Sequence, residues 1–378
     1  MSEIKSLRSA LRVLLVIEPS GGGSGRHVID LARELAALHH EVVVVYSPIR
    51  AEPMFVRELQ GLSLVAVEAL PMRRAVGLWD IGAARALRRV IDRLGPFDVI
   101  HGHSSKAGAL VRLVAPRGSA RVYTPHAFRT MDPATGNWDR ILFGGVETLL
   151  ASLVSDAVIA VSPEEAEHAQ SLGIPANKLH LIINGLAPAP VVDREAARDV
   201  LGLKRGDIAV GFVGRLCAQK DPVRFAEAIR LAHARNPRLR GIVLGDGELK
   251  GATLASGGNA LTVHSGLNAR EYLPAFDLLV MTSRYEAMPY VLLEALQAGL
   301  PILSTAVGGT SVAVVEGENG ALLSLDAAGT EIADFILSHA HSDRLAALGA
   351  ASRVKGARLT ASKMARETLS VYHQACKT

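Results

Sequence analysis

The stretch SRYEAMPYVLLEALQAGLP at residues 283–301 places two carboxylates, Glu286 and Glu294, on either side of a predicted helix start. Pro289 suits the first helical position, where its missing N–H is no loss. VLLEALQA consists of good helix formers, and the Gly-Leu-Pro that follows signals the helix end. Glu286 is therefore expected in the loop before the helix, and Glu294 about one and a half turns inside it.

The predicted helix start is an anion site, because free N–H groups and the helix dipole point into the space above it. A diphosphate there would have one carboxylate on either side, and each carboxylate can accept a hydrogen bond from a sugar hydroxyl. This pattern favours a nucleotide-sugar ligand. The same spacing also fits a capping Glu followed by a Glu on a solvated helix face, so the rest of the chain has to decide.

The segment resembles the E-x7-E signature of the retaining family 4 glycosyltransferases, which have the two-domain GT-B fold. Further matches to that family follow in order at 211–221 (GFVGRLCAQKD), 245–249 (GDGEL), 273–286 (LPAFDLLVMTSRYE) and 301–309 (PILSTAVGG). The N-terminal half resembles bacterial enzymes that build cell-surface polysaccharides, at 18–27 (EPSGGGSGRH), 101–108 (HGHSSKAG) and 123–128 (YTPHAF). The resemblance covers nearly the whole chain.

Short apolar runs alternate with amphipathic helical stretches, beginning with RVLLVI at 12–17 and EVVVVY at 41–46. This rhythm predicts an α/β fold with parallel sheets covered by helices. After a Pro, Gly and Ala-rich stretch at 184–193, the rhythm resumes with IAVGFVG at 208–214. Two similar halves are expected, and the resemblance implies two Rossmann-like GT-B domains whose parallel sheets face across a cleft.

We predict three parts of the chain from this organisation. Residues 1–186 form an N-terminal, acceptor-binding Rossmann-like domain, and residues 187–360 form a C-terminal, nucleotide-sugar-binding one. Residues 361–378 form a last helix that returns to the N-terminal domain, as the resemblance implies.

The composition describes a globular, intracellular protein. With 378 residues, 49% of them hydrophobic and 21% charged, the chain can build two sizeable cores. Two cysteines imply no disulfide framework. The first apolar run is short and ends in a glycine loop, which predicts a strand and not a signal peptide, and no segment is long enough to span a bilayer. An aromatic content of 4% argues against a nucleic-acid partner.

Positive charge is concentrated between residues 70 and 130, where eleven Lys or Arg face three Asp or Glu. Arg85, Arg88, Arg89 and Arg93 recur there on helical spacing. A basic amphipathic helix can lie against anionic lipid or hold a phosphorylated acceptor, although a solvated surface helix also explains the pattern. Together with the resemblance, this predicts a cytoplasmic enzyme that is peripheral on the inner face of the cytoplasmic membrane.

The glycine loop GGGSGRH at 21–27 follows a strand and opens a helix, so its backbone N–H groups can approach a phosphate closely. A dinucleotide-binding loop is excluded, because Val28 stands where the third glycine belongs and the second strand lacks a terminal acid. In similar glycosyltransferases this loop closes over the donor diphosphate. Gly22 and Gly23 are therefore predicted to bind the donor.

Arg215 and Lys220 follow a predicted buried strand and can neutralise a diphosphate leaving group without a metal ion. Asp246 and Glu248 form the alternative, since a hard cation accepts such oxygen ligands. The glycines beside Asp246 make a tight turn the simpler account, so we expect no metal cofactor.

Among the histidines, the resemblance places His126 beside the donor sugar. His103 and Lys106 are candidate acceptor-binding residues. His101 and His103 share one face of a strand, which is compatible with a metal site, but the sequence offers no evident third ligand.

The resemblance implies a retaining hexosyl- or N-acetylhexosaminyl-transferase, with Glu286, His126, Arg215 and Lys220 as its catalytic residues. The donor is a nucleotide-diphosphate sugar, UDP-sugar favoured over GDP-mannose, and the acceptor a polyprenyl-diphosphate-linked saccharide. A sugar-nucleotide epimerase of the same fold and a transferase with a soluble acceptor remain as alternatives. Further donor-binding residues are expected around the carboxylates, at Ala287, Met288, Pro289 and Glu294. Many relatives have glycine where Ala287 stands, which questions the local sugar contacts.

Overall fold

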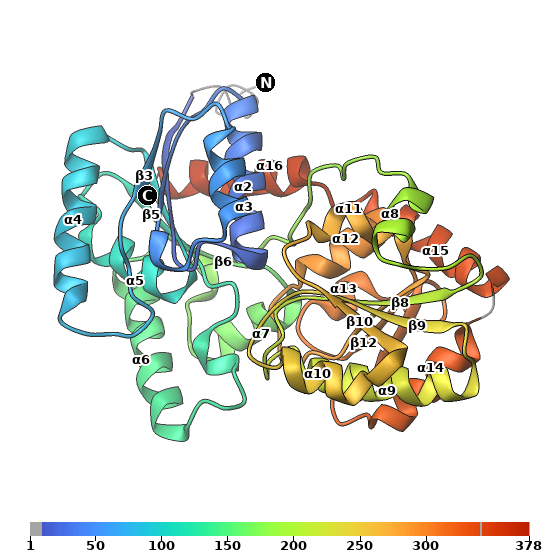
Figure 1. Cartoon of the computed structure of the whole chain (residues 1–378). Coiled ribbons are helices and arrows are strands. Elements are labelled where there is room, and N and C mark those ends of the chain that lie inside the picture. The colour runs from blue at the N-terminus through green and yellow to red at the C-terminus, as the bar shows by residue number, and fades with distance from the viewer. Residues whose placement is uncertain (1–9, 341, 378) are drawn as a thin grey trace. The chain divides into compact units, whose positions relative to one another are not determined.

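The computed structural model describes residues 10–340 and 342–377, and it divides into two units. The N-terminal unit consists of the described residues up to Ala187 together with those from Thr360 onward, and the C-terminal unit runs from Pro188 to Leu359. Each unit has a sheet of parallel strands flanked by helices (Figure 1).

The N-terminal unit contains a seven-stranded parallel sheet in the order β3-β2-β1-β4-β5-β6-β7, counted over the described residues. β1 lies inside the sheet, and its Val13 pairs with Val42 on one side and Val99 on the other. The strands are β1 Arg12–Ile17, β2 Glu41–Tyr46, β3 Ala66–Ala69, β4 Val99–His103, β5 Ala120–Thr124, β6 Ala157–Ala160 and β7 Leu179–Leu181.

Helices cover both faces of this sheet, because β1 is apolar from Val13 to Ile17 and points alternate side chains to opposite faces. Val13 and Leu15 pack in one core with α2 and α16, while Leu14 and Val16 pack in another with α4 and α5. The helices of the unit are α2 Gly22–Ala37, α3 Pro53–Gln60, α4 Trp79–Leu94, α5 Ser104–Val114, α6 Asn137–Leu153, α7 Pro163–Ser171 and α16 Ala361–Ala375.

The last helix, α16, completes the core of the N-terminal unit. The Thr360 hydroxyl caps it by accepting a hydrogen bond from the Lys363 N–H at 3.2 Å. Met364 and Leu369 pack with the core that includes α2. Buried Tyr372 also reaches the sheet, where its hydroxyl lies 2.7 Å from Nδ1 of His101 on β4.

The C-terminal unit contains a six-stranded parallel sheet in the order β10-β9-β8-β11-β12-β13 among the described residues. Its strands are β8 Ile208–Val213, β9 Leu239–Leu244, β10 Leu261–His264, β11 Leu278–Met281, β12 Ile302–Thr305 and β13 Gly320–Leu323. Its helices are α8 Arg194–Val200, α9 Pro222–Arg235, α10 Lys250–Gly257, α11 Ala269–Tyr272, α12 Tyr290–Ala298, α13 Thr310–Ala313, α14 Gly329–His339 and α15 Ser342–Gly356.

The strand order brings particular loops together in each unit. In the C-terminal unit β8 pairs with β9 on one side and β11 on the other, so the direction of winding reverses between β8 and β11. The loops that follow these two strands therefore meet at the carboxyl edge of the sheet, where ligands of such folds bind. In the N-terminal unit β1, β4 and β5 are neighbours, so the loops that follow these three strands also meet at the carboxyl edge of their sheet.

The helix predicted after Pro289 is α12, and it begins one residue later than expected. Pro289 is the N-cap residue, with extended backbone angles, and Tyr290 is the first helical residue. The predicted end is confirmed, since Gly299 follows the helix with φ of 72°, a left-handed angle that suits glycine.

No described helix combines the length and hydropathy that crossing a bilayer requires.

Candidate functional site

In the C-terminal unit, an ion pair joins the loop after β8 to the loop after β11. The Lys220 ammonium lies 2.5 Å from Oε1 of Glu286, and both side chains are largely withdrawn from solvent. Glu286 itself is buried, with 8% of its surface exposed. Two residues that sequence reasoning selected independently are thus brought together, at the edge of the sheet where the topology predicts a ligand.

Further hydrogen bonds hold the same two loops together. The Thr282 hydroxyl donates to the backbone oxygens of Lys220 and Asp221, at 3.0 and 2.8 Å. Gln219 accepts from the Arg284 N–H at its backbone oxygen, and its side-chain amide donates to the backbone oxygen of Tyr285. Sequence reasoning missed Gln219 and Thr282, although both lie inside the two motifs, because neither residue type signals a loop-to-loop bond.

The remaining predicted residues of this unit differ in how far they are exposed to solvent. Arg215 is exposed, and its guanidinium lies 3.5 Å from the Gln219 side-chain oxygen, a long hydrogen bond. Glu294 lies half-buried in the middle of α12, as the sequence predicts for a residue inside the helix. Ala287 and Met288 are buried. Ala287 does not adopt a positive φ, so alanine causes no backbone strain at this position.

A glycine pair after β12 packs directly on the backbone of the Glu286 loop. A Cβ atom on Gly308 would lie 2.3 Å from the Glu286 carbonyl oxygen, closer than real Cβ atoms approach. Gly309 has φ of 75° and a built Cβ would lie 2.7 Å from the Ala287 oxygen. These glycines therefore set the position of Glu286, Ala287 and Met288.

Gly308→Ala is expected to destabilise the protein by about 1–3 kcal/mol, because the added methyl group must displace the Glu286 backbone. Urea unfolding followed by circular dichroism measures the change. Gly251→Ala is the matched control, since a Cβ at that helical position meets nothing within 4 Å. Equal stability of the two variants would show that the Glu286 loop can move to admit the methyl group, and would contradict the prediction.

The candidate cation residues Asp246 and Glu248 lie in a tight turn. Gly247 has φ of 153°, and the turn packs on the loop after β8 through a 2.8 Å hydrogen bond from the Leu216 N–H to the Asp246 carbonyl oxygen. The Asp246 carboxylate accepts from the Gly247 N–H at 2.8 Å. These contacts explain the GDGE motif as a turn that supports the Arg215 loop.

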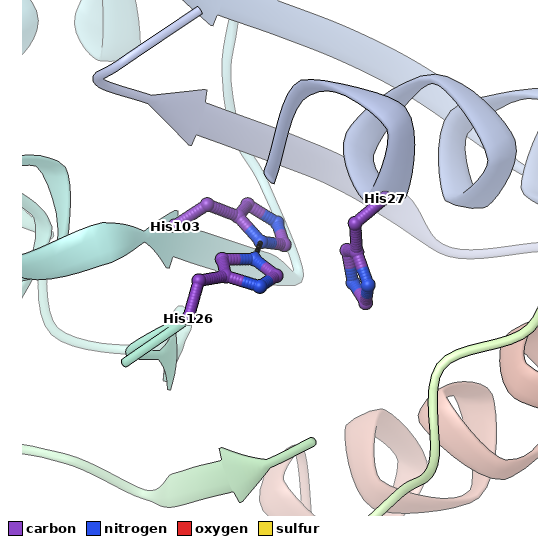
Figure 2. A group of neighbouring side chains, drawn as sticks. All are labelled: His27, His103 and His126. Carbon is purple, nitrogen blue, oxygen red and sulfur yellow. Dashed lines mark hydrogen bonds between the residues drawn. The ribbon is translucent and has the colours of Figure 1, made fainter. Parts of the chain in front are cut away.

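In the N-terminal unit, three histidines from different elements converge. His27 lies on α2, His103 ends β4, and His126 follows β5 (Figure 2). Nδ1 of His103 lies 3.2 Å from Nε2 of His126, and the ring centres of His27 and His126 are 4.7 Å apart. Burial lowers the pKa of all three, that of His27 to about 4, so the imidazoles are neutral near pH 7.

A fourth histidine, His101, is satisfied within the protein. Its Nδ1 lies 2.7 Å from the Tyr372 hydroxyl and its Nε2 2.8 Å from the Thr124 hydroxyl. The ring centres of His101 and His103 are 4.0 Å apart, which confirms the prediction that both side chains lie on one face of the strand. The further neighbours of His103 are His27 and His126, which come from distant segments, so the sequence offered no evident third ligand.

The backbone around His126 is unusual. His126 and Ala127 have φ of 55° and 81°, a left-handed conformation that non-glycine residues rarely adopt. The fully buried Glu165 carboxylate holds this turn, accepting from the N–H groups of Ala127 at 2.7 Å and Val161 at 2.8 Å. Such strain persists where the surroundings enforce it, often at functional sites. Sequence reasoning missed Glu165; its position three residues after the helix cap Ser162 was the available signal.

Glu165→Gln is expected to destabilise the protein by about 1–3 kcal/mol, because an amide nitrogen cannot accept and one buried N–H loses its partner. Denaturant unfolding followed by tryptophan fluorescence measures the loss, since both tryptophans, Trp79 and Trp138, lie in this unit. Glu167→Gln, at an exposed position of the same helix, should change little. Unaltered stability of Glu165→Gln would contradict the clamp.

The other predicted residues of this unit are Gly22, Gly23 and Lys106. Gly22 and Gly23 are exposed in the first turn of α2, which has no acidic residue and no side-chain cap. The ammonium of Lys106 is withdrawn from solvent and lies 2.6 Å from the Asp80 carboxylate. Its role at an acceptor site stays a prediction.

The basic helix predicted to meet a membrane is α4, and its apolar face is used by the core. Leu87 and Ile91 are buried, Arg88 pairs with Asp92, and Arg93 pairs with Glu68. Exposed apolar side chains lie at the start of α4, where Trp79 and Ile81 face solvent, and also on α6. The inner face of α6 uses the small residues Gly144 and Ala151 and the ion-paired Glu147. Its outer face exposes Trp138, Ile141, Leu142, Val146, Leu149 and Leu153.

Comparisons with known proteins agree with this architecture. The family model described as Glycosyltransferase Family 4 matches residues 21–189, and the one described as Glycosyl transferases group 1 matches residues 207–340. A UDP-Gal:alpha-D-GlcNAc-diphosphoundecaprenol alpha-1,3-galactosyltransferase from Escherichia coli is 27% identical over 245 residues, which cover 61% of this chain and 63% of that relative's length. A D-inositol 3-phosphate glycosyltransferase from Xylanimonas cellulosilytica is 28% identical over 94% of this chain and 92% of its own.

The fold is also shared with solved structures. The crystal structure of Anabaena Alr3699/HepE in complex with UDP and glucose has a TM-score of 0.79 to this chain, with 20% sequence identity. The match covers 95% of this chain and 99% of that one. With two parallel sheets, matched glycosyltransferase models in both halves and this structural likeness, the chain belongs to the family 4 glycosyltransferases of the GT-B fold.

Proposed function

We propose that this glycosyltransferase is a retaining enzyme that uses a nucleotide-diphosphate sugar, with a UDP-sugar favoured over GDP-mannose. The observation that carries the proposal is the ion pair between Lys220 and Glu286 at the carboxyl edge of the second sheet, directly before α12. A lysine here can take up the charge of a departing diphosphate, and a carboxylate beside it can hold a sugar hydroxyl. The UDP that accompanies Alr3699/HepE supports the choice of donor.

In this proposal the other donor contacts are those that the family resemblance implies. Arg215 adds an exposed guanidinium for the diphosphate, and Glu294 holds the ribose. His126 contacts the transferred hexosyl or N-acetylhexosaminyl group. No described side chain is assigned as a nucleophile, because a retaining enzyme of this kind can use the leaving phosphate oxygen as the base. The charges of Lys220 and Arg215 make the reaction independent of a metal cofactor.

We propose a polyprenyl-diphosphate-linked saccharide as the acceptor, at the inner face of the cytoplasmic membrane, in cell-surface polysaccharide synthesis. The name of the Escherichia coli relative includes such an acceptor. The exposed apolar face of α6 supports contact with lipid, since its large side chains are unusual on a solvated helix. Arg129 and Arg140, near the start of the helix, suit an anionic surface.

A soluble acceptor is the second candidate, because the relative that covers 94% of this chain is named for D-inositol 3-phosphate. Incubation with radiolabelled UDP-sugars and GDP-mannose, with lipid extract or with inositol phosphate, separates the candidates. Counts in the lipid fraction support the proposal, and counts in the small-acceptor product support the alternative. Turnover of the donor to free nucleotide or an isomer without an acceptor would indicate an epimerase.

Leu142→Glu combined with Leu149→Glu is expected to weaken binding to anionic lipid vesicles by more than about tenfold. Each exposed leucine would contribute about 1.5–3 kcal/mol if the lipid buried it completely. Vesicle sedimentation measures the loss. Val354→Glu, at an exposed apolar position of the other unit, serves as the control. Vesicle binding that is the same for all three proteins would exclude α6 as the membrane face.

A further inference from the structure

We propose that His27, His103 and His126 bind one divalent metal ion of the zinc class. The three imidazoles come from α2, the end of β4 and the loop after β5, and they lie around a common space (Figure 2). One ring nitrogen from each lies within 4.8 Å of the others. Three histidine nitrogens with an open fourth position form a recurrent zinc donor set.

Two of the ligands already stand at the spacing that a metal requires. Nδ1 of His103 and Nε2 of His126 are 3.2 Å apart. Tetrahedral zinc bonds of about 2.0–2.1 Å place two ligand nitrogens roughly 3.3 Å apart. Without a metal, one of these nitrogens has to donate a proton to the other, and a bound cation would replace that proton.

The third ligand is oriented by a partner outside the cluster. Nδ1 of His27 lies 3.0 Å from Oδ1 of buried Asn184, and an amide oxygen only accepts, so His27 carries its proton on Nδ1. Nε2 then keeps its lone pair for a ligand. A metal-binding histidine characteristically donates its second N–H to a carbonyl or carboxylate in this way.

The cluster is not a finished network of protein hydrogen bonds. Buried His103 has no hydrogen-bond partner for Nε2 among the described residues, whereas both nitrogens of neighbouring His101 are engaged. With a metal on Nδ1 of His103, the ring proton would lie on Nε2, and Nδ1 would no longer share a proton with His126.

Cobalt(II) titration of tag-free, chelator-treated protein tests the proposal. We expect one Co²⁺ per chain with the intense visible absorption of tetrahedral coordination, displaced by an equivalent of Zn²⁺. His27→Gln and His126→Gln should each weaken cobalt binding beyond the roughly 10–100-fold loss typical of an outer-shell partner. Circular dichroism establishes that each variant is folded.

His180→Gln is the control, since His180 lies on β7 of the same unit outside the cluster. Tetrahedral absorption that persists in His180→Gln and disappears in both cluster variants supports the site. Weak octahedral absorption only, or equal affinity in all four proteins, overturns it.

Zinc is also expected to slow sugar transfer, because a metal on His126 would withdraw that side chain from the donor sugar. This expectation, unlike the metal site, rests on the proposed function. Stoichiometric cobalt binding without inhibition would refute the role of His126 and leave the site standing. Inhibition that also occurs in the cluster variants would show that zinc acts elsewhere and would count against the site.

Discussion

Glu286→Gln is expected to reduce sugar transfer by about 100–1,000-fold, the loss that follows removal of one pre-positioned polar group from a transition state. The structure gives this carboxylate a fixed place, since its side chain pairs with Lys220 and its backbone packs on Gly308. Glutamine keeps the shape but loses the charge and one acceptor, so the sugar hydroxyl would be held poorly. Initial rates with the best donor measure the effect.

Glu318→Gln is the control for that experiment, because it makes the same chemical change at an exposed position of the same unit. Lys220→Met and the double variant complete a cycle that measures the coupling of the ion pair. If the two residues act together on the donor, the double variant loses much less than the product of the single losses. Undiminished transfer by Glu286→Gln would refute the proposed site.

Acidification is expected to destabilise the N-terminal unit of the metal-free protein strongly between pH 6.5 and 4. His27 has a pKa near 4 in the folded unit, mainly because burial disfavours the charged ring, and near 6.5 when unfolded. Between those values the unfolded chain binds more protons, so stability is full above the upper value and falls toward the lower one. This residue alone accounts for roughly 3 kcal/mol.

His101, His103 and His126 act in the same direction, since burial lowers their pKa values as well. Glu165 acts in the opposite direction. Burial raises its pKa from 4.5 to about 7 despite two backbone N–H donors, so its contribution is present at low pH and lost as pH rises through 7. Glu165→Gln should therefore make the dependence on pH steeper.

Urea unfolding in a chelating buffer from pH 4 to 7.5 measures these effects, with tryptophan fluorescence as the probe of this unit. His27→Gln should flatten the dependence. His39→Asn should leave it unchanged, because His39 is exposed and asparagine tolerates its φ of 66°. Stability that is constant over this range would contradict the burial of neutral histidines.

Much of the fold was predictable because each sheet is built from continuous apolar runs. RVLLVI at 12–17 and IAVGFV within 208–214 became the inner strands β1 and β8. β7 and β13 were not predicted, since LHL and GALL are too short to show a period. Their pairing along neighbouring strands, and not their own sequence, makes them strands.

The site was predictable to the same degree as its topology. Lys220 and Glu286 belong to loops that adjacent strands bring to one edge, so the order of motifs was enough to place them at one site, although not to predict their ion pair. The meeting of His27, His103 and His126 depends on side-chain directions in three separate segments. The pairing of Lys106 with Asp80 depends on how α4 lies against α5. Neither the histidine cluster nor this ion pair can be predicted from the local sequence.

The N-terminal unit is made of two pieces of chain, with α16 arriving after the whole C-terminal unit. During synthesis, the ribosome must therefore release the C-terminal unit before Tyr372 can pack on the N-terminal unit and bind His101. The contiguous C-terminal unit can fold as soon as it emerges, whereas its predecessor waits with an unfinished core. For this chain, the usual order in which earlier segments mature before later ones is reversed.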